Sequence, residues 1–447
     1  MSRLFRGPLA LRFQWPKLST WHAEQSEDPS HARSPRLIHT ANRLDHIEPF
    51  YVMELAKVAM AIAESPACDP KQGGEPMVFL NIGEPDFTAA KSVVQAAQRC
   101  LEQRQTAYTQ ATGLLELRTR LSSWYAKQFK VDVDPGCIVI TAGASAALQL
   151  ACLALFEPGD EVLMPDPSYP CNRHFVAATG ATPMLLATDA GSRFQPRADS
   201  VRAAWGPYTR GVLLASPSNP TGTSISRPEM AAIAQTAKAR GGITLVDEIY
   251  LGLSYDPAFG QSVLSLQDEG GAPLRDHLIS INSFSKYFGM TGWRLGWMVL
   301  PPELVAPVER LAQNLYICPS TVSQRAALAC FEPESLAEFE ARRAEFARRR
   351  DYCVSALQDM GLPVPVPPDG AFYAWFDCSR YSNDSWDFCQ QMMKRAHVAL
   401  TPGRDFGPTW ARQFVRLSFA SSMEQLETAM QRLRRELRAL ETAVNRG

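Results

Sequence analysis

The chain has 447 residues, and its 45 lysines and arginines nearly balance its 46 aspartates and glutamates. A chain of this length can bury a large core and has room for about three domains. The balanced charge provides no electric field that favours nucleic acid, an anionic membrane or a strongly charged protein partner.

Ten cysteines are spread from Cys68 to Cys389, and no two of them stand at the short spacing of a zinc or redox pair. They are typical of small buried side chains in a reducing compartment. No apolar stretch approaches the roughly 20 residues that a helix needs to cross a bilayer. The sequence therefore predicts a cytoplasmic protein with no metal site, no membrane partner and no nucleic-acid partner.

Residues 1–42 differ in composition from the rest of the chain. They contain no continuous apolar run of the kind found in a secretory signal. Four basic residues precede the first acidic residue, Glu24: Arg3, Arg6, Arg12 and Lys17. An organellar transit peptide and a disordered tail, or an upstream start codon chosen in error, are both open interpretations, and we favour the tail. The ordered chain is predicted to begin near Asp45, with a helix at Met53–Ala63.

From residue 78 onward, strand-like and helix-like segments alternate. The strand candidates are short and apolar: Ile138–Thr141, Glu161–Met164, Gly211–Ser216, Ile243–Asp247, His277–Asn282 and Trp293–Leu300. Helical stretches separate several of them: Ala144–Phe156, Arg227–Arg240 and Pro302–Leu315. Short apolar strands separated by helices are typical of βαβ units, so the sequence predicts an α/β fold with a mostly parallel sheet.

The pattern changes after about residue 330. A long charged helix at Leu336–Met360 precedes strands at Ala371–Asp377 and Val415–Phe419 and a closing helix at Met423–Leu440. This order predicts a smaller α+β domain. We divide the chain accordingly: a disordered or weakly ordered tail at 1–42, an N-terminal part of the small domain at 43–75, a large domain at 76–325, and the rest of the small domain at 326–447.

In an open parallel sheet, ligands bind beyond the carboxyl ends of the strands. The residues that follow each strand candidate are therefore site candidates. Gly143-Ala144-Ser145 opens a helix, and the first N–H groups of a helix attract anions. The other segments are Pro217–Gly222, Asp247–Tyr250 and Ser283–Lys286. Taken singly, each has an ordinary explanation: a tight turn, a loop of turn-forming residues, a carboxylate at a strand end and a surface lysine.

Taken together, five segments closely resemble the class I/II aminotransferases of pyridoxal-phosphate (PLP) fold type I: Gly83-Glu84-Pro85-Asp86-Phe87, Asn219-Pro220-Thr221-Gly222, Asp247-Glu248-Ile249-Tyr250, Ser283-Phe284-Ser285-Lys286 and Arg416-Leu417-Ser418-Phe419. The most specific element is the Ser-x-Ser-Lys segment with Arg294 eight residues after its lysine. The resemblance extends from about Ile47 to Leu440. It implies a large domain with a seven-stranded, mostly parallel sheet between helices and a smaller α+β domain. It also implies a ping-pong transfer of an amino group from an L-amino acid to a 2-oxo acid.

The resemblance gives the cofactor residues their roles. Lys286 would carry PLP as a Schiff base and later act as the base that moves the proton at Cα. Asp247 would pair with the pyridine nitrogen, and a protonated ring drains charge from Cα. Asn219 and Tyr250 would hydrogen-bond the 3′ oxygen of the cofactor, and Tyr169 would stack on its ring.

For the phosphate, the resemblance implies the guanidinium of Arg294, the hydroxyl of Ser283 and the backbone N–H groups of Ala144 and Ser145. Tyr108 resembles the tyrosine that reaches the phosphate of the neighbouring subunit. The enzyme is therefore expected to be a homodimer whose active sites are shared between two chains.

On the substrate side, Arg416 would clamp the α-carboxylate, assisted by Asn219 and by the backbone N–H near Gly83. Ser145 stands where some bacterial aspartate aminotransferases carry a lysine that grips a second carboxylate. A serine cannot supply that charge. We therefore expect a neutral donor, either alanine or a larger apolar or aromatic amino acid, with 2-oxoglutarate or pyruvate as acceptor. Apolar and aromatic residues are expected to form the pocket wall: Phe50-Tyr51-Val52, Tyr316 and Phe372-Tyr373.

Two alternatives stay open. A C–S β-lyase or a cyclopropane-carboxylate synthase would share the fold, the cofactor and most of these residues, although no feature of the chain requires either. A transcription regulator with an aminotransferase-like domain would need a winged helix-turn-helix ahead of that domain. The segment before Asp45 is too short for one, and the chain is not basic.

Overall fold

The computed structural model describes residues 40–49 and 51–444. Most of the predicted tail, residues 1–39, lies outside the described residues, and so does Phe50 of the predicted pocket wall. The contacts within the chain separate Met1–Leu44 from a compact unit that begins at Asp45, and the fold described below is that of this unit.

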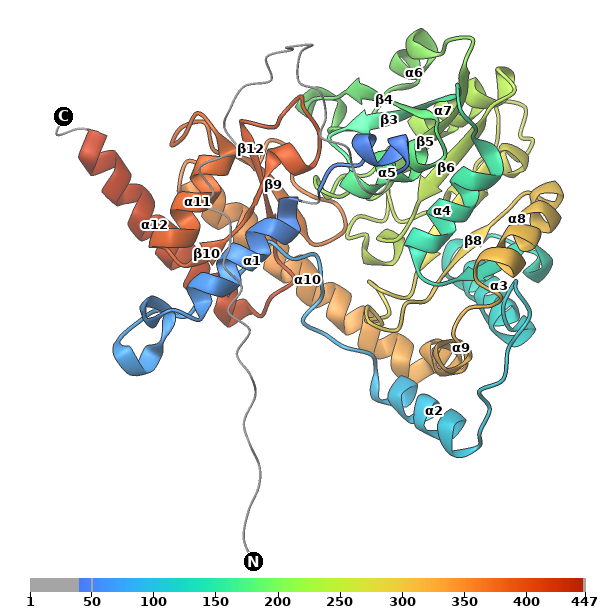
Figure 1. Ribbon diagram of the computed structural model, residues 1–447, viewed down its shortest axis with the longest axis horizontal. Coiled ribbons are helices and arrows are strands. Elements are labelled where there is room, and N and C mark those ends of the chain that lie inside the picture. The colour runs from blue at the N-terminus through green and yellow to red at the C-terminus, as the bar shows by residue number, and fades with distance from the viewer. Residues whose placement is uncertain (1–39, 50, 445–447) are drawn as a thin grey trace, which may run out of the picture. The chain divides into compact units, whose positions relative to one another are not determined.

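A seven-stranded sheet forms the centre of the larger part of this unit (Figure 1). Its strands are β2 (Ile138–Thr141), β3 (Glu161–Asp166), β4 (Thr182–Ala187), β5 (Thr209–Ala215), β6 (Ile243–Asp247), β7 (Leu278–Ser283) and β8 (Gly296–Val299). Their order is β2-β8-β7-β6-β5-β3-β4. β8 is antiparallel to both of its neighbours, while β7, β6, β5, β3 and β4 pair in parallel. The predicted fold class, α/β with a mostly parallel sheet, is confirmed.

Helices cover both faces of this sheet because its strands are apolar on both faces. In β5, Val212 and Leu214 pack with α7 on one face, whereas Leu213 packs with α4 on the other. α4 (Ala144–Leu155) also contacts α5 (Pro170–Ala178) and α8 (Pro302–Leu315), and α7 (Arg227–Ala239) contacts α6 (Ala198–Ala204). Three further helices belong to this part of the chain: α2 (Lys91–Glu102), α3 (Leu115–Phe129) and α9 (Thr321–Ala327).

A second group of elements surrounds an antiparallel three-stranded sheet with the order β11-β12-β9. Its strands are β9 (Tyr373–Asp377), β11 (Thr401–Pro402) and β12 (Phe414–Ser418). A separate parallel pair is formed by β1 (Val78–Phe79) and β10 (Val398–Ala399). The helices of this group are α1 (Tyr51–Ala63), α11 (Ser385–Arg395) and α12 (Met423–Val444). The long helix α10 (Pro333–Asp359) packs on α12 and β9 and links the two groups (Figure 1).

The observed elements differ from the predicted ones in two instructive places. The predicted strand Trp293–Leu300 begins only at Gly296, because Arg294 has a left-handed φ of 48° that a strand cannot contain. The strand predicted from Ala371 begins at Tyr373, since Ala371 also has a positive φ of 58°. The division of the chain at residues 75 and 325 stays a prediction.

The described part of the chain contains no helix with the length and apolar character needed to cross a membrane. The same residues include no cluster of histidine, cysteine and acidic side chains that could hold a metal ion. All ten cysteines lie in the described part and are free thiols.

Candidate active site

Lys286 lies in the turn that follows β7, at the edge where the parallel strands end. Its Nζ donates a hydrogen bond to the carbonyl oxygen of Gly83 at 2.5 Å and lies 5.6 Å from the ring centre of Phe372. Burial lowers the pKa of the Lys286 amine to about 8, although the charge of Glu84 opposes the shift. About a tenth of this amine is therefore neutral and nucleophilic at pH 7, far more than for an ordinary lysine.

Asp247 is the last residue of β6, the strand beside β7. Its Oδ1 accepts a hydrogen bond from the N–H of Ile249 at 3.0 Å. Burial raises the pKa of the Asp247 carboxyl to about 6, against the effects of this hydrogen bond and of the Lys286 charge. A buried carboxylate of this kind is stabilised by a cation beside its second oxygen.

Tyr250 follows Asp247 by three residues, and its hydroxyl shares a hydrogen bond of 2.8 Å with the hydroxyl of Tyr373. Tyr373 belongs to β9, so this hydrogen bond connects the two sheets. Burial raises the pKa of Tyr250 well above its usual value, and the neighbouring Tyr373 raises it further. Both tyrosines therefore stay neutral and act as hydrogen-bond donors or acceptors. Gly83 fits here only as a glycine, because a Cβ would lie 2.1 Å from the Tyr373 hydroxyl.

Arg416 lies within β12 and is only 4% exposed. Its guanidinium donates to Oδ1 of Asn219 at 2.8 Å and to the backbone oxygen of Asn81 at 2.7 Å. It also lies over the rings of Tyr373 and Phe406, at 4.4 and 5.0 Å from their centres. Since an arginine only donates, the oxygen of the Asn219 amide must face Arg416, and its NH₂ group is left for another acceptor.

A separate cluster of polar groups surrounds the first turn of α4, whose backbone N–H groups have no partner inside the helix. Gly143 precedes this helix with a φ of 84°, and a Cβ on it would lie 2.7 Å from a terminal nitrogen of Arg294. The Ser283 hydroxyl contacts that of Ser285 at 2.8 Å in the turn after β7. The guanidinium, these hydroxyls and the N–H groups of Ala144 and Ser145 form a set of donors suited to an anion.

The structure thus brings together most of the residues that the sequence singles out. Tyr169 immediately precedes α5 and follows the carboxyl end of β3, the strand beside β5. Tyr108 is different, because it is 80% exposed in the segment between α2 and α3. Of the predicted pocket wall, Phe372 lies beside Lys286, whereas Tyr316 donates its hydroxyl to Gln149 on α4 at 2.5 Å.

Two contributions to the site are not evident from the sequence. Tyr373 was expected only as pocket wall, yet it bonds Tyr250 and lies under Arg416. The backbone oxygen of Asn81 was not expected as a partner of Arg416. The sequence pattern of β9 predicts neither contact, because both depend on how this strand packs against the neighbouring strands and loops.

Comparison with known proteins agrees with this geometry. The model of the family "Aminotransferase class I and II" matches residues 75–433. The valine–pyruvate aminotransferase of Mycobacterium tuberculosis is 38% identical over 387 residues, which cover 87% of this chain and 96% of that protein. An aspartate aminotransferase of Thermotoga maritima is 33% identical over 393 residues, covering 88% of this chain and 98% of that protein.

Solved structures agree as well. The crystal structure of an aminotransferase from Mycobacterium tuberculosis has a TM-score of 0.82 and 36% identity, covering 90% of this chain and 100% of that one. The aspartate aminotransferase from Thermus thermophilus with maleate has a TM-score of 0.79 and 30% identity, covering 89% and 100%.

Proposed function

The chain belongs to the class I and II aminotransferases and is an enzyme of amino-group transfer, and we propose that it transfers the amino group by means of pyridoxal phosphate held at Lys286. The family uses this cofactor on amino acids and 2-oxo acids. The observation that supports the proposal most directly is the pair formed by the Lys286 amine and the Asp247 carboxyl. Asp247 ends β6 and Lys286 follows the end of the neighbouring strand β7, and their pKa values are shifted toward each other, to about 6 and about 8.

The residues around this pair fit a phosphorylated pyridine aldehyde. A protonated ring nitrogen would supply the cation that the buried Asp247 carboxylate lacks. The free NH₂ group of Asn219 and the hydroxyl of Tyr250 would bond the ring oxygen, and Tyr169 would cover the ring face. The donor set at α4 would hold the phosphate: Ala144, Ser145, Ser283 and Arg294.

When bound, the cofactor supplies an aldehyde that takes up the amino group and a ring that withdraws electrons from Cα. The protein contributes the rest. Arg416 binds the substrate carboxylate with its two terminal nitrogens, and the N–H near Gly83 assists, which orients the Cα–H bond. The Lys286 amine accepts the Cα proton, for which its pKa of about 8 is suited. Asp247 would hold the proton on the ring nitrogen of the bound cofactor.

We infer a neutral donor, such as alanine or a larger apolar or aromatic amino acid, with pyruvate or 2-oxoglutarate as acceptor. Ser145 is exposed at the start of α4 and carries no charge. Among the described residues, the groups in direct contact with Arg416 are also uncharged: Asn81, Asn219, Tyr373, Thr401 and Phe406. Ile82, beside Gly83, exposes an apolar side chain. One relative is named for valine and pyruvate, although others are named for aspartate.

A half-reaction screen tests this proposal. The full-length protein is loaded with pyridoxal phosphate and mixed with single L-amino acids, and the absorbance of the bound cofactor is followed over time. Neutral apolar or aromatic donors should react at least about tenfold faster than aspartate, a factor worth about 1.4 kcal/mol of barrier. Aspartate reacting fastest would contradict the inferred donor class. Continuous release of ammonia would instead support a C–S β-lyase, which the names of the relatives do not favour.

We also propose that the enzyme is a homodimer in which Tyr108 reaches the phosphate site of a second copy. The support is the position of Tyr108, which is exposed on its own chain although the resemblance makes it a phosphate ligand. A cytoplasmic location stays a prediction.

A further inference from the structure

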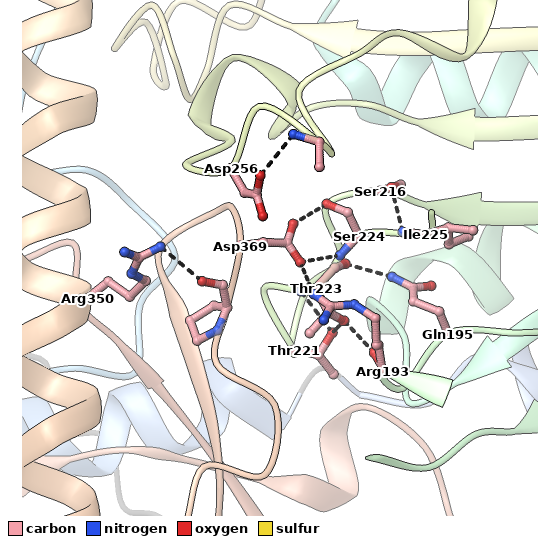
Figure 2. A network of polar contacts seen from close by, with 12 residues as sticks. Arg193, Gln195, Ser216, Thr221, Thr223, Ser224, Ile225, Asp256, Arg350 and Asp369 are labelled. Carbon is pink, nitrogen blue, oxygen red and sulfur yellow. Dashed lines mark hydrogen bonds and ion pairs between the residues drawn. The ribbon is translucent and has the colours of Figure 1, made fainter. Parts of the chain in front are cut away.

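Asp369 is a buried carboxylate that the proposed function does not use. It lies between α10 and β9 and is 6% exposed. Its carboxylate accepts three hydrogen bonds: from the Ser224 N–H at 2.9 Å, the Ser224 hydroxyl at 2.5 Å and the Arg193 guanidinium at 2.5 Å. Figure 2 shows these groups converging on Asp369. Burial raises the pKa of this carboxyl, and the three hydrogen bonds oppose that effect.

The backbone of Asp369 is held as firmly as its side chain. The N–H groups of Asp369 and Gly370 both donate to the carbonyl oxygen of Gly222 at 3.0 Å. The carbonyl oxygen of Asp369 accepts from the N–H of Tyr255 at 2.7 Å. The packing leaves no space, because a Cβ on Gly222 would lie 2.5 Å from Pro368, and a Cβ on Gly370 would lie 2.4 Å from Pro217.

We call residues 216–225, which follow β5, the Asn219 loop. Apart from the hydrogen bond with Tyr255, the contacts described above are made with this loop or with Arg193, which is itself bonded to the loop. At its base, the Ser216 N–H donates to the Asp247 carbonyl oxygen at 3.1 Å. Within it, Ser218 and Thr223 share a backbone hydrogen bond of 3.0 Å, and Gly222 donates to the oxygen of Ser218 at 2.9 Å. Arg193 is tied to the same loop, because its carbonyl oxygen accepts from the Thr223 hydroxyl at 2.6 Å (Figure 2).

The tip of this loop carries Asn219, whose Oδ1 is bonded by Arg416. The loop is therefore held from two sides, by Arg416 at its tip and by Asp369 along the side that includes Gly222 and Ser224. The segment that contains Asp369 continues into Tyr373, which bonds Tyr250. One stretch of chain, residues 368–373, thus supports both side chains proposed to bond the ring oxygen of the cofactor.

We propose that Asp369 is a positioning residue that fixes the Asn219 loop, so that the Asn219 amide faces Arg416 with its oxygen and the cofactor with its NH₂ group. The inference rests on the proposed function for the identity of that second partner. The hold on the loop itself exists without a cofactor. In Asp369→Asn, the amide oxygen can still accept from the Ser224 N–H and from Arg193, with the NH₂ group facing the Ser224 hydroxyl. The acceptor is then neutral and the ion pair with Arg193 is lost, so the hydrogen bonds that fix the loop become weaker.

The chain offers a matched control in Asp160. It is also a buried carboxylate, at 8% exposed, and accepts a backbone N–H from Glu157 at 3.0 Å. It pairs with Arg210 at 3.2 Å, as Asp369 pairs with Arg193. Asp160 precedes β3, at the end of the strand opposite to the candidate active site. Asp160→Asn should therefore lose similar interactions without moving the Asn219 loop.

Three measurements compare these variants with the wild type. In the cofactor-free full-length protein, hydrogen–deuterium exchange of peptides covering residues 217–224 should accelerate by about tenfold in Asp369→Asn, the factor expected for one charged hydrogen bond. In the loaded protein, the pH midpoint of the cofactor absorbance should rise by about half a unit or more, because a weaker Asn219 hydrogen bond stabilises the deprotonated form less. The KM for the amino acid should rise more than kcat falls. Asp160→Asn should change none of these.

Unchanged exchange and an unchanged midpoint in Asp369→Asn would overturn the inference, and so would equal changes in Asp160→Asn. If Asp369→Asn does not fold, Ser224→Ala removes one of the three hydrogen bonds and keeps the carboxylate. This variant should change the exchange rate and the pH midpoint in the same direction as Asp369→Asn, with exchange about threefold faster. No change in either quantity would also overturn the inference. A wild-type protein that binds no pyridoxal phosphate would contradict the proposed function, while the exchange result would still decide whether Asp369 holds the loop.

Discussion

The two sheets bring residues to the candidate active site in different ways. The seven-stranded sheet contributes residues at or after the carboxyl ends of parallel strands: Asn219, Asp247, Tyr250 and Lys286. The three-stranded sheet contributes Tyr373 and Arg416, which lie within strands. A polar residue after a parallel strand is recognisable from local sequence, because that edge is where ligands bind. A polar residue inside a buried strand is explained only by its partners.

Those partners come from the other sheet. Arg416 bonds Asn219, and Tyr373 bonds Tyr250. Each strand residue therefore supports one residue at the carboxyl ends of the parallel strands, which we call the parallel edge. A buried charge or hydroxyl without such a partner would cost free energy. The difference predicts a hierarchy, in which residues of the parallel edge perform the chemistry and Tyr373 supports one of them.

The parallel edge is tested most severely by Lys286→Ala. Without the amine, no group remains to hold the cofactor covalently or to accept the Cα proton. We expect turnover to fall by several orders of magnitude, beyond the roughly 10²–10⁴ typical of one acid–base group. Single-turnover kinetics with the best donor measure this loss. Lys394→Ala, at an exposed lysine on α11, is the control. Turnover within about tenfold of the wild type would remove Lys286 from the mechanism.

Asp247→Asn tests the neighbouring strand. The amide keeps the size of the carboxylate but loses the charge that would hold the ring nitrogen protonated. We expect the cofactor to stay bound while the half-reaction slows by about a hundredfold or more. Asp160→Asn, again a buried carboxylate away from the site, controls for burial alone. A rate within about threefold of the wild type, under 1 kcal/mol of barrier, would show that Asp247 is not the partner of the ring.

The same difference explains how far the sequence could be interpreted. Asp247 ends the apolar strand β6 and Lys286 closely follows the apolar strand β7. The predicted bounds of β6, and also those of β2, agree with the structure. The direction of β8 could not be predicted, because an antiparallel strand has the same apolar composition as a parallel one. β1, β10 and β11 have two residues each and carry no periodicity. The contacts of Asp369 could not be predicted from local sequence, since its partners Ser224 and Arg193 lie 145 and 176 residues away in the chain.

Tyr108 belongs to neither sheet and tests whether a second chain completes the site. Tyr108→Phe deletes one hydroxyl and should weaken retention of pyridoxal phosphate by about 1.5–3 kcal/mol, the range for a hydrogen bond to a charged group. Equilibrium dialysis against the cofactor measures this change. Tyr208→Phe is the control, because Tyr208 is another exposed tyrosine, at 61%, in the turn before β5.

Mixing variants locates the hydroxyl. In a heterodimer of Lys286→Ala and Tyr108→Phe chains at limiting cofactor, one site carries both lesions and the other carries neither. Such mixtures should recover up to about half of the activity of a wild-type dimer. Mixtures with no recovered activity would place both residues in the same chain's site, and an active monomer in sedimentation would exclude sharing altogether.

The smallest effect is expected at Tyr373, the strand residue that acts through Tyr250. Tyr373→Phe removes a neutral hydrogen bond, which contributes about 0.5–1.5 kcal/mol, so kcat/KM should fall by less than about tenfold. Tyr125→Phe is the matched control, because Tyr125 is also fully buried and its hydroxyl bonds Trp297, Ser280 and Asn282, none of which is a proposed site residue. The control should lose stability without losing activity.

A double-mutant cycle decides whether Tyr373 supports Tyr250 or acts by itself. If Tyr373 only orients the Tyr250 hydroxyl, its removal has nothing left to disturb once Tyr250 is phenylalanine. The double variant should then have the kcat/KM of Tyr250→Phe alone, with a coupling energy close to the whole effect of Tyr373→Phe. Additive losses would mean that Tyr373 contacts substrate or cofactor directly, and the residues within strands would then take part in the chemistry alongside those at the parallel edge.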